Sequence, residues 1–483
     1  MIELTETAPV GETIASVTRV AEPVRVPSSR YVSAAWAARE QERLWPHVWQ
    51  IAGTQDHVAE PGDWFEYQVG WLSVIVLRAG DGSLQAYQNV CRHRGNALLC
   101  GEGRELSELR CGYHRWCWDL GGSLKEVPSR KGFGTLRNDE LGLFPVQVGE
   151  WASFVFVNLD PHAEPLDAFL EGIPDDAPWL GLEDFRCTYD LVTPMPCNWK
   201  TLIDGFSETY HVQGLHREML PMTDDVNSPQ RLWNRHGKLV QPYGVASPRL
   251  RDGATAQEIY DAFVAVMGTR IGRSITEPTG PVPEVAEGST LREVLADAVR
   301  LNAAGMGADL SNLSTDQVMN MQQYNLFPNT TIIAFPDLLQ VVKSRPGPTP
   351  DECFMDMFVF ERAASGSPRT PPMRVTVQPG DLDFGMVINQ DVEALSRVQR
   401  GLHQPGFTEL VLSGEECRIV NLHRNLEHFL DLTGPELDFV ALARGMGVPA
   451  ERPDDAEGLT AALTRAIAEP GPHLIEAVIP SGF

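Results

Sequence analysis

Two short cysteine–histidine pairs constrain the fold of this 483-residue chain more than any other feature. The first pair is Cys91-x-His93 and the second is Cys111-x2-His114. Residues before the first pair alternate as short strands do, at 64–69, 72–78 and 84–90. We therefore expect both pairs to lie on loops of a small antiparallel β unit, where they can close one metal site.

Two metal chemistries fit these pairs. Zinc takes two cysteines and two histidines in a tetrahedral site. A Rieske [2Fe–2S] cluster instead uses two cysteines on one iron and two histidines on the other. The C-x-H spacing disfavours a usual zinc finger, in which like ligands are two to four residues apart. Two further cysteines nearby break the paired spacing and are interpreted as structural thiols, Cys100 and Cys117.

The stretch 198–216 indicates a helix with two faces. Its apolar residues recur at helical spacing: Trp199, Leu202, Ile203, Phe206 and Tyr210. Asp204, Glu208 and His211 share a second face, and His216 follows shortly after them. Two neighbouring histidines are part of a 2-His-1-carboxylate iron site. The alternative is a helix whose histidine pair has only a structural role.

Both motifs resemble those of the Rieske non-haem iron oxygenases, the aromatic-ring-hydroxylating oxygenase α subunits. The Rieske half of the resemblance rests on the motifs C-R-H-R-G at 91–95 and C-G-Y-H-R-W at 111–116, and on a later strand at 154–160. It implies a [2Fe–2S] cluster with four ligands: Cys91, His93, Cys111 and His114. The family usually has C-P-Y-H-G-W in the second motif, so Gly112 and Arg115 depart from the pattern while the ligands are intact.

The catalytic half of the resemblance rests on D-G-F-S-E-T-Y-H at 204–211, followed by His216. It implies that His211 and His216 bind mononuclear iron. It also implies that Asp204 is a hydrogen-bonded bridge for electrons arriving from His114 of a neighbouring subunit. Two other matched residues are left open between ligand support and structure: Glu208 and Tyr210.

The family places the third iron ligand, a carboxylate, at the start of a late helix. Residues 389–402 fit such a helix, with Asn389 as its N-cap. Asp391 shares a face with apolar residues, namely Leu395, Val398 and Leu402. Glu393 lies with arginines on a solvated face, so the periodicity favours Asp391 as the ligand over Glu393. A first-turn aspartate favoured only by the helix dipole is the alternative.

The expected fold class is α+β. A Rieske antiparallel β domain precedes a helix-grip catalytic domain, in which an antiparallel sheet surrounds a long helix. The predicted divisions are an N-terminal helical segment of the catalytic domain at 1–44, the Rieske domain at 45–160, the catalytic domain at 161–430 and a tail at 431–483. Predicted catalytic elements are helices at 256–267 and 290–304, a Pro/Gly-rich loop at 277–288, and strands at 330–335, 338–342 and 353–360. His423 and His428 are interpreted as interface or surface residues.

The tail resembles the last α-α-β piece of thiamine-diphosphate-dependent enzymes of the acetolactate synthase type. The residues that carry this resemblance are 437–449, 456–463 and 470–479. The G-D-G…N stretch that binds the diphosphate through magnesium is absent, so no thiamine chemistry is assigned. A packing module, an oligomerisation module and a fusion remnant remain alternatives.

Composition limits the partners. The formal net charge is −26, which argues against nucleic acid or an anionic membrane. No run of 18 apolar residues indicates a transmembrane helix, and the first residues lack the features of a signal peptide. We expect a cytoplasmic protein.

The resemblance implies a terminal oxygenase that uses O2 to hydroxylate or dihydroxylate an apolar, aromatic or other cyclic, substrate. The alternative is a monooxygenase that demethylates an N-methyl or O-methyl substrate. The cofactors would be the Rieske [2Fe–2S] cluster and mononuclear Fe(II). No flavin or NAD fingerprint occurs, so a separate reductase, with or without a ferredoxin, would supply electrons. A homotrimer or an α3β3 assembly is expected.

Overall fold

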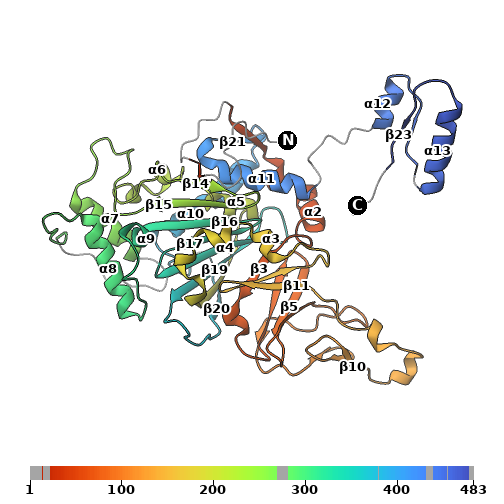
Figure 1. Ribbon diagram of the computed structural model, residues 1–483, viewed down its shortest axis with the longest axis horizontal. Coiled ribbons are helices and arrows are strands. Elements are labelled where there is room, and N and C mark those ends of the chain that lie inside the picture. The colour runs from red at the N-terminus through yellow and green to blue at the C-terminus, as the bar shows by residue number, and fades with distance from the viewer. Residues whose placement is uncertain are drawn as a thin grey trace. The chain divides into compact units, whose positions relative to one another are not determined.

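The computed structural model describes residues 22–268, 281–378, 380–430, 439–453 and 455–477, and the backbone of 13–14. These residues form two compact units, one ending at Leu430 and a smaller one that begins at residue 431 (Figure 1). No helix of the described residues is long and apolar enough to cross a membrane.

Residues 50–158 of the larger unit build three small antiparallel sheets. Their strand orders are β6-β5-β4-β7, β11-β12-β3 and β10-β9-β8. The strand bounds are β3 Gln50–Thr54, β4 Trp64–Val69, β5 Leu72–Arg78, β6 Leu84–Gln88, β7 Glu102–Gly103, β8 Leu109–Arg110, β9 Cys117–Trp118, β10 Leu124–Glu126, β11 Gln147–Trp151 and β12 Phe154–Asn158. The three predicted strands before the first Cys/His pair are confirmed.

A sheet of nine described strands forms the second part of the larger unit (Figure 1). Its order is β1-β14-β15-β16-β17-β18-β19-β13-β20, and every pairing is antiparallel except that of β13 with β20. The bounds are β1 Thr13–Ile14, β13 Phe185–Met195, β14 Gln230–Leu232, β15 Gly237–Pro242, β16 Asn320–Leu326, β17 Thr330–Ala334, β18 Leu338–Pro346, β19 Cys353–Arg362 and β20 Met373–Thr376.

Three helices pack in succession on this sheet. Helix α5 (Trp199–Gly205) contacts β18 and β19, α10 (Met386–Leu402) contacts α5, and α11 (Cys417–Phe429) contacts β15. Further helices of the unit are α3 Leu166–Leu170, α4 Ile173–Asp176, α6 Val212–Leu215, α7 Ala256–Gly268, α8 Leu291–Gly305 and α9 Thr315–Met319. The predicted α+β class, a small β domain joined to a large sheet with helices, is confirmed.

The N-terminal segment contacts the rest of the larger unit through a strand pairing and a buried ion pair. Strand β2 (Val24–Pro27) pairs with β21 (Glu409–Leu412), and the short helix α1 (Ser29–Val32) leads into α2 (Ala34–Arg43). Glu40 of α2 accepts a hydrogen bond from Lys200 Nζ at 2.6 Å and another from Trp199 Nε1 at 2.9 Å. Glu40 and Lys200 are both almost fully buried, so the direct ion pair between them compensates charges that would otherwise be costly to bury.

The single helix predicted over 198–216 is wrong. Helix α5 ends at Gly205, and the four-residue α6 begins only at Val212. The Phe206 carbonyl accepts hydrogen bonds from Asn325 Nδ2 at 3.0 Å and Thr331 Oγ1 at 3.2 Å, both from the sheet. Because these side chains take a carbonyl that a continuous helix would use, the chain turns away from the helix axis here.

Helix α10 begins three residues earlier than predicted. Asn389 therefore lies inside the helix instead of capping it, and its Oδ1 accepts from Phe384 N at 3.1 Å. Asp391 and Leu395 are buried as predicted, but Val398 is exposed and Gln399 takes its place. A spacing of four residues continues from Leu395 to Gln399, which explains the change.

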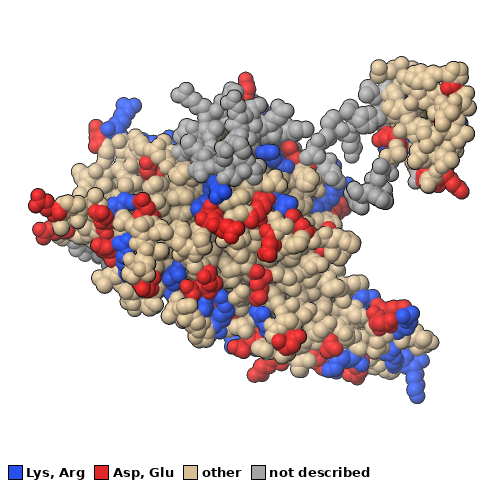
Figure 2. All heavy atoms as spheres, viewed as in Figure 1, with Lys and Arg blue, Asp and Glu red and all other residues tan. Residues whose placement is uncertain are grey.

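Helices α7 and α8 confirm the two helices predicted in the variable region. The predicted loop at 277–288 lies partly outside the described residues, and its described part, 281–288, has no helix or strand. On the face drawn in Figure 2, Asp and Glu are interspersed with Lys and Arg over the larger unit. The described residues therefore present no continuous basic surface on that face.

The smaller unit alternates helices and strands. Its elements are α12 Phe439–Gly445, β22 Ala450–Glu451, α13 Ala456–Ala468 and β23 Leu474–Ile475, and β22 pairs in parallel with β23. The α-α-β order predicted for the tail thus lacked the short strand β22. Part of the predicted last strand, 478–479, lies outside the described residues.

Candidate active site

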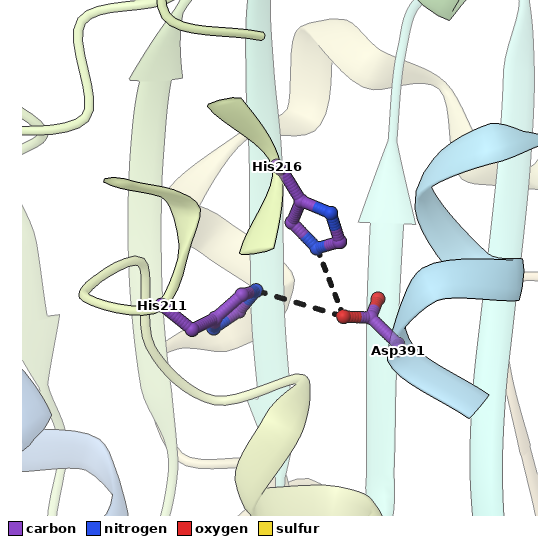
Figure 3. Close-up of side chains that lie close together, drawn as sticks. All are labelled: His211, His216 and Asp391. Carbon is purple, nitrogen blue, oxygen red and sulfur yellow. Dashed lines mark hydrogen bonds and ion pairs between the residues drawn. The ribbon is translucent and has the colours of Figure 1, made fainter. Parts of the chain in front are cut away.

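The three predicted iron ligands come together beside the sheet. His211 and His216 lie at the two ends of α6, and Asp391 comes from α10 (Figure 3). His216 Nε2 is 2.9 Å from Asp391 Oδ1, and His211 Nε2 is 3.8 Å from the same oxygen. Two imidazoles and one carboxylate that converge within 4.8 Å fit a divalent iron and leave other coordination positions open.

The proton on each of the two predicted ligand histidines is fixed by a neighbouring side chain. Glu208 Oε1 lies 2.5 Å from His211 Nδ1, and Gln390 Oε1 lies 2.7 Å from His216 Nδ1. Gln390 donates through Nε2 to Glu218 at 3.2 Å, so its oxygen faces the histidine. Both Nδ1 atoms therefore donate, and both Nε2 atoms are left to bind a metal.

Glu208 also sets the electrostatics of this site. Burial alone would lower the pKa of His211, but the carboxylates of Glu208 and Asp391 together outweigh burial and raise that pKa. Burial would raise the pKa of Glu208, and the adjacent His211 outweighs it and lowers that pKa. Glu208 is therefore an ionised acceptor that strengthens the donor character of the His211 ring.

Asp204 lies elsewhere than the predicted bridging role requires. Its Oδ2 accepts a hydrogen bond from Tyr31 Oη at 2.6 Å, and its Oδ1 is buried without a partner. Tyr31 Oη is also 2.7 Å from His423 Nε2. The contact with His211 that a bridge needs is made by Glu208, because the helix ends at Gly205 and the two carboxylates no longer share a face.

The structure also corrects the interpretation of His423 as an interface or surface residue. His423 is fully buried in α11 beside Tyr31, whereas His428 is exposed as predicted. Burial lowers the pKa of His423 well below its ordinary value. Tyr31, which comes from the N-terminal segment, could not be placed here from the helix pattern alone.

The two Cys/His pairs lie on two loops with the same backbone pattern. Cys91 N donates to Asn96 O, and Cys111 N donates to Trp116 O, each at 2.8 Å. Gly95 N and Arg115 N donate back to the carbonyls of the two cysteines. The loops are therefore matched, and they present the two pairs in equivalent ways.

Arg115 occupies the position in the second loop that Gly95 occupies in the first. Both have a left-handed backbone, with φ of 76° at Gly95 and 64° at Arg115. This conformation suits glycine and costs other residues about 1 kcal/mol. The departure of Arg115 from the family pattern therefore introduces local strain, not a different loop.

The paired loops fit a two-iron cluster better than one zinc ion. The His93 and His114 rings are 4.7 Å apart, both cysteines are buried, and His93 Nδ1 is buried without a hydrogen-bond partner. Among the described residues, only the His211, His216 and Asp391 set brings its ligand atoms within 4.8 Å of one another. The four loop ligands are thus spread more widely than a tetrahedral zinc requires.

A cavity of about 110 Å³ opens beside the triad. It is lined by His211, His216 and Asp391, and by aromatic residues, methionines and glutamines. The rings of Tyr243 and Phe335 in its wall are 5.5 Å apart. The cavity therefore places apolar and aromatic surface beside the predicted iron ligands.

The fold and this site define an α subunit of a Rieske-type iron oxygenase. Residues 182–431, just over half of the chain, match the family described as the ring-hydroxylating α subunit catalytic domain. Residues 48–144 match the Rieske [2Fe–2S] domain. The chain belongs to the ring-hydroxylating α subunit family, and its cofactors are a Rieske cluster and a mononuclear iron.

Curated relatives share part of their length with this chain. The carnitine monooxygenase oxygenase subunit of Escherichia coli K12 is 29% identical over 233 residues, which are 46% of this chain and 59% of that relative. The chloroplastic choline monooxygenase of Spinacia oleracea is 34% identical over 203 residues, 40% of this chain and 45% of that relative. The chain thus spans about half the length of the curated relatives it matches.

Solved structures share the fold. The quaternary ammonium Rieske monooxygenase CntA, in complex with L-carnitine, has a TM-score of 0.59 at 17% identity, covering 83% of this chain and 94% of that one. Naphthalene 1,2-dioxygenase from Rhodococcus sp. has a TM-score of 0.58 at 18% identity, covering 85% of this chain and 95% of that one.

Sequence reasoning missed several residues of the site. Gln390 precedes the predicted ligand Asp391 directly, so its position was a usable signal. Glu208 is part of the matched motif, but the motif does not decide between ligand support and a structural role for it. The glutamines of the cavity gave no signal, since their convergence depends on the strand register.

Proposed function

We propose that this chain is a terminal oxygenase that removes a methyl group from a substrate bearing an N-methylated ammonium. The observation that carries the proposal is the cavity that joins the predicted iron triad to an aromatic wall. The curated relatives named for carnitine and choline support a substrate with an N-methylated ammonium, which the demethylation alternative includes, over the apolar aromatic substrate that the family resemblance implies.

The cavity offers two features that suit a cation. Tyr243 and Phe335 present ring surface, and the faces of aromatic rings attract ammonium groups. Glu208 and Asp391 add carboxylates at the same cavity. An N-methyl carbon can therefore lie near the triad while its positive charge is balanced by neighbouring groups.

The chain's own residues prepare the site for oxygen chemistry. When bound, the iron would supply open coordination positions for O2, and the cluster would store one of the two electrons that the reaction needs. His211, His216 and Asp391 would hold the iron, with their orientation fixed by Glu208 and Gln390. Cys91, His93, Cys111 and His114 would hold the cluster.

Glu208 is the better candidate for the electron bridge. It contacts the predicted ligand His211 directly, whereas Asp204 is bonded to Tyr31. His114 of a neighbouring subunit would deliver the electron in a homotrimer or an α3β3 assembly. A reductase, with or without a ferredoxin, would be the source of electrons in a cytoplasmic system.

The overall reaction balances for a trimethylammonium substrate. Two electrons and two protons reduce one oxygen atom of O2 to water, and the other atom enters a methyl C–H bond. The resulting hydroxymethyl group leaves as formaldehyde when its C–N bond breaks, with the electron pair kept by nitrogen and one proton released.

Coupled turnover with a surrogate reductase tests this function. The purified chain is given trimethylammonium compounds, methoxy-aromatic compounds and unsubstituted aromatic hydrocarbons, and product masses are measured. The proposal predicts loss of one methylene unit (CH3 replaced by H) from the trimethylammonium compounds, together with formaldehyde. Oxygenated aromatic products without any demethylation would overturn it.

A further inference from the structure

Three glutamines line one wall of the active-site cavity. Gln241 lies on β15, Gln323 on β16 and Gln340 on β18, and at least 94% of each residue's surface is buried. Their carboxamides are polar groups in a cavity otherwise lined largely by apolar and aromatic side chains. Buried amides normally have partners, so this set requires an explanation.

The strand register places the three side chains on one face of the sheet. Gln323 lies opposite Ile333, and Ile333 lies opposite Gln340, so these side chains form a row across β16, β17 and β18. Gln323 also lies opposite Leu239, which is two residues before Gln241 and shares its face. The convergence therefore follows from the backbone and does not depend on one side-chain conformation.

Two of the carboxamides lack partners. The Nε2 atoms of Gln241 and Gln340 are buried without a hydrogen-bond partner among the described residues. An unsatisfied buried amide costs about 1–3 kcal/mol. Two such groups in the wall of one cavity indicate that a ligand with acceptor atoms completes their hydrogen bonding.

Arg418 determines which end of Gln323 faces the cavity. Arg418 Nη1 donates to Gln323 Oε1 at 2.5 Å, and Arg418 Nε donates to Gln230 Oε1 at 3.0 Å. A guanidinium has donors only, so the Gln323 oxygen must face it. The Gln323 Nε2 group is then directed away from Arg418 as a donor.

Arg418 is a buried positive charge with incomplete compensation. It is 3% exposed, and its Nη2 has no hydrogen-bond partner among the described residues. Glu208 is the one carboxylate that acts on it electrostatically from further away. A negative group bound to Gln323 would be stabilised by this charge through the polarised amide.

We propose that Gln241, Gln323 and Gln340 form a subsite that donates hydrogen bonds to a carboxylate of the substrate. This inference rests on the proposed function, because it specifies the other end of the same substrate. The substrate class is then a zwitterion, with an N-methylated ammonium toward the triad and a carboxylate toward the glutamine row.

Equilibrium binding to the full chain tests the subsite. The probes are ω-trimethylammonio carboxylates of two to four carbons and the alkyltrimethylammonium ions of matched length, measured by titration calorimetry. A hydrogen bond to a charged group contributes enough to change affinity about tenfold or more. The carboxylates should therefore bind at least about tenfold more tightly than the matched ions.

Two variants of one residue make the test specific. Gln323→Leu should remove most of the carboxylate advantage while the alkyltrimethylammonium ions bind as before. Gln323→Glu keeps an acceptor for Arg418, so it preserves the fold. It should also abolish the tighter binding of the carboxylates, because it presents a carboxylate oxygen to the ligand in place of the amide donor. A carboxylate advantage that persists in both variants, or is absent from the wild-type chain, overturns the subsite.

Gln322→Leu is the matched control. Gln322 directly precedes Gln323 on β16 and points to the opposite face of the sheet, so its replacement should leave the tighter binding of the carboxylates intact. If Gln322→Leu weakened the binding of the carboxylates as much as Gln323→Leu does, the effect would come from the sheet in general, and the glutamine subsite would be overturned.

Turnover separates this inference from the proposed function. If the carboxylates bind with Gln323 dependence but lose no methyl group, the subsite stands and the proposed reaction fails. If alkyltrimethylammonium ions are demethylated as efficiently as the carboxylates, the reaction stands and the subsite is overturned.

Discussion

The carboxylate of Glu208 lies 2.5 Å from Nδ1 of His211, and it is this contact, not one from Asp204, that joins an acidic side chain to a predicted iron ligand. Glu208 fixes the proton of the His211 ring on Nδ1, so Nε2 points toward Asp391. The same carboxylate is largely buried and lies in the lining of the cavity.

We predict that Glu208→Gln lowers turnover strongly while both metal centres remain. Partners of ligand histidines typically contribute about 10–100-fold to activity or metal affinity. Iron content, the visible spectrum and product formation are measured together. Asp204→Asn is the control and should leave turnover within about twofold. A strong loss of turnover in Asp204→Asn with little loss in Glu208→Gln would instead support Asp204 as the electron bridge.

The triad makes a second prediction. His211→Ala and Asp391→Ala should each lose mononuclear iron and product formation but keep the visible absorption of the cluster, because the Cys/His loops lie in a different sheet system. Glu393→Ala, an exposed change on the same helix, is the matched control. Metal analysis and absorption spectroscopy decide the outcome, and unchanged iron in Asp391→Ala would exclude Asp391 as a ligand.

Asp204 gives a prediction about pH. Burial raises the pKa of Asp204 to about 7 in the folded protein, whereas an unfolded aspartate has a pKa of about 3.9. Between these two pH values Asp204 is protonated in the folded chain and ionised in the unfolded chain. The stabilisation that this proton gives the folded chain is therefore fully present below about pH 4 and is lost as the pH rises to about 7.

Asp204→Asn removes this titration. The free energy of unfolding of the variant, relative to that of the wild-type chain, should therefore increase from about pH 5 to about pH 8. Urea unfolding at both pH values checks this. Parallel pH dependence in the two proteins would show that Asp204 is already ionised at the lower value.

The buried pair of Glu40 and Lys200 gives a prediction about stability. Glu40→Gln leaves the Lys200 ammonium buried without its counter-charge, so we expect a loss of about 3 kcal/mol in the free energy of unfolding. Glu42→Gln, at an exposed position of the same helix, should change it by less than about 0.5 kcal/mol. Equal effects of the two changes in denaturant unfolding would contradict this account of the pair.

The smaller unit gives the last prediction. A chain that ends at Leu430 should keep both iron centres, because residues from 431 onward form a compact unit of their own. Iron content and the visible spectrum are measured on the shortened chain, and its molar mass in solution is compared with that of the full chain. Loss of either metal centre would show that the tail supports the larger unit.

Several features of the site could be predicted because each lies within a short sequence pattern. The Cys/His loops follow from strands, turns and the ligand spacing. The family resemblance points to a carboxylate at the start of a late helix, and the periodicity of that helix favours Asp391 over Glu393. Their placement in the structure agrees with those patterns.

Other features depend on contacts between distant segments. The break after Gly205 is caused by Asn325 and Thr331 from the sheet, and no pattern within 198–216 records them. The resemblance implies a bridging role for Asp204, and the contacts of Tyr31 with Asp204 and of Glu208 with His211 come from the folded arrangement, not from the motif. His423 is buried because Tyr31 arrives from the other end of the chain.

A single-turnover experiment tests the central claim most directly. The purified chain is chemically reduced, mixed with O2 and a trimethylammonium carboxylate, and the dimethylamino product is measured by mass spectrometry beside Asp391→Ala. We predict demethylated product in the wild-type chain and none in the variant, although both oxidise their clusters. Absence of product from the wild-type chain across the trimethylammonium probes, or equal product from Asp391→Ala, would contradict the account.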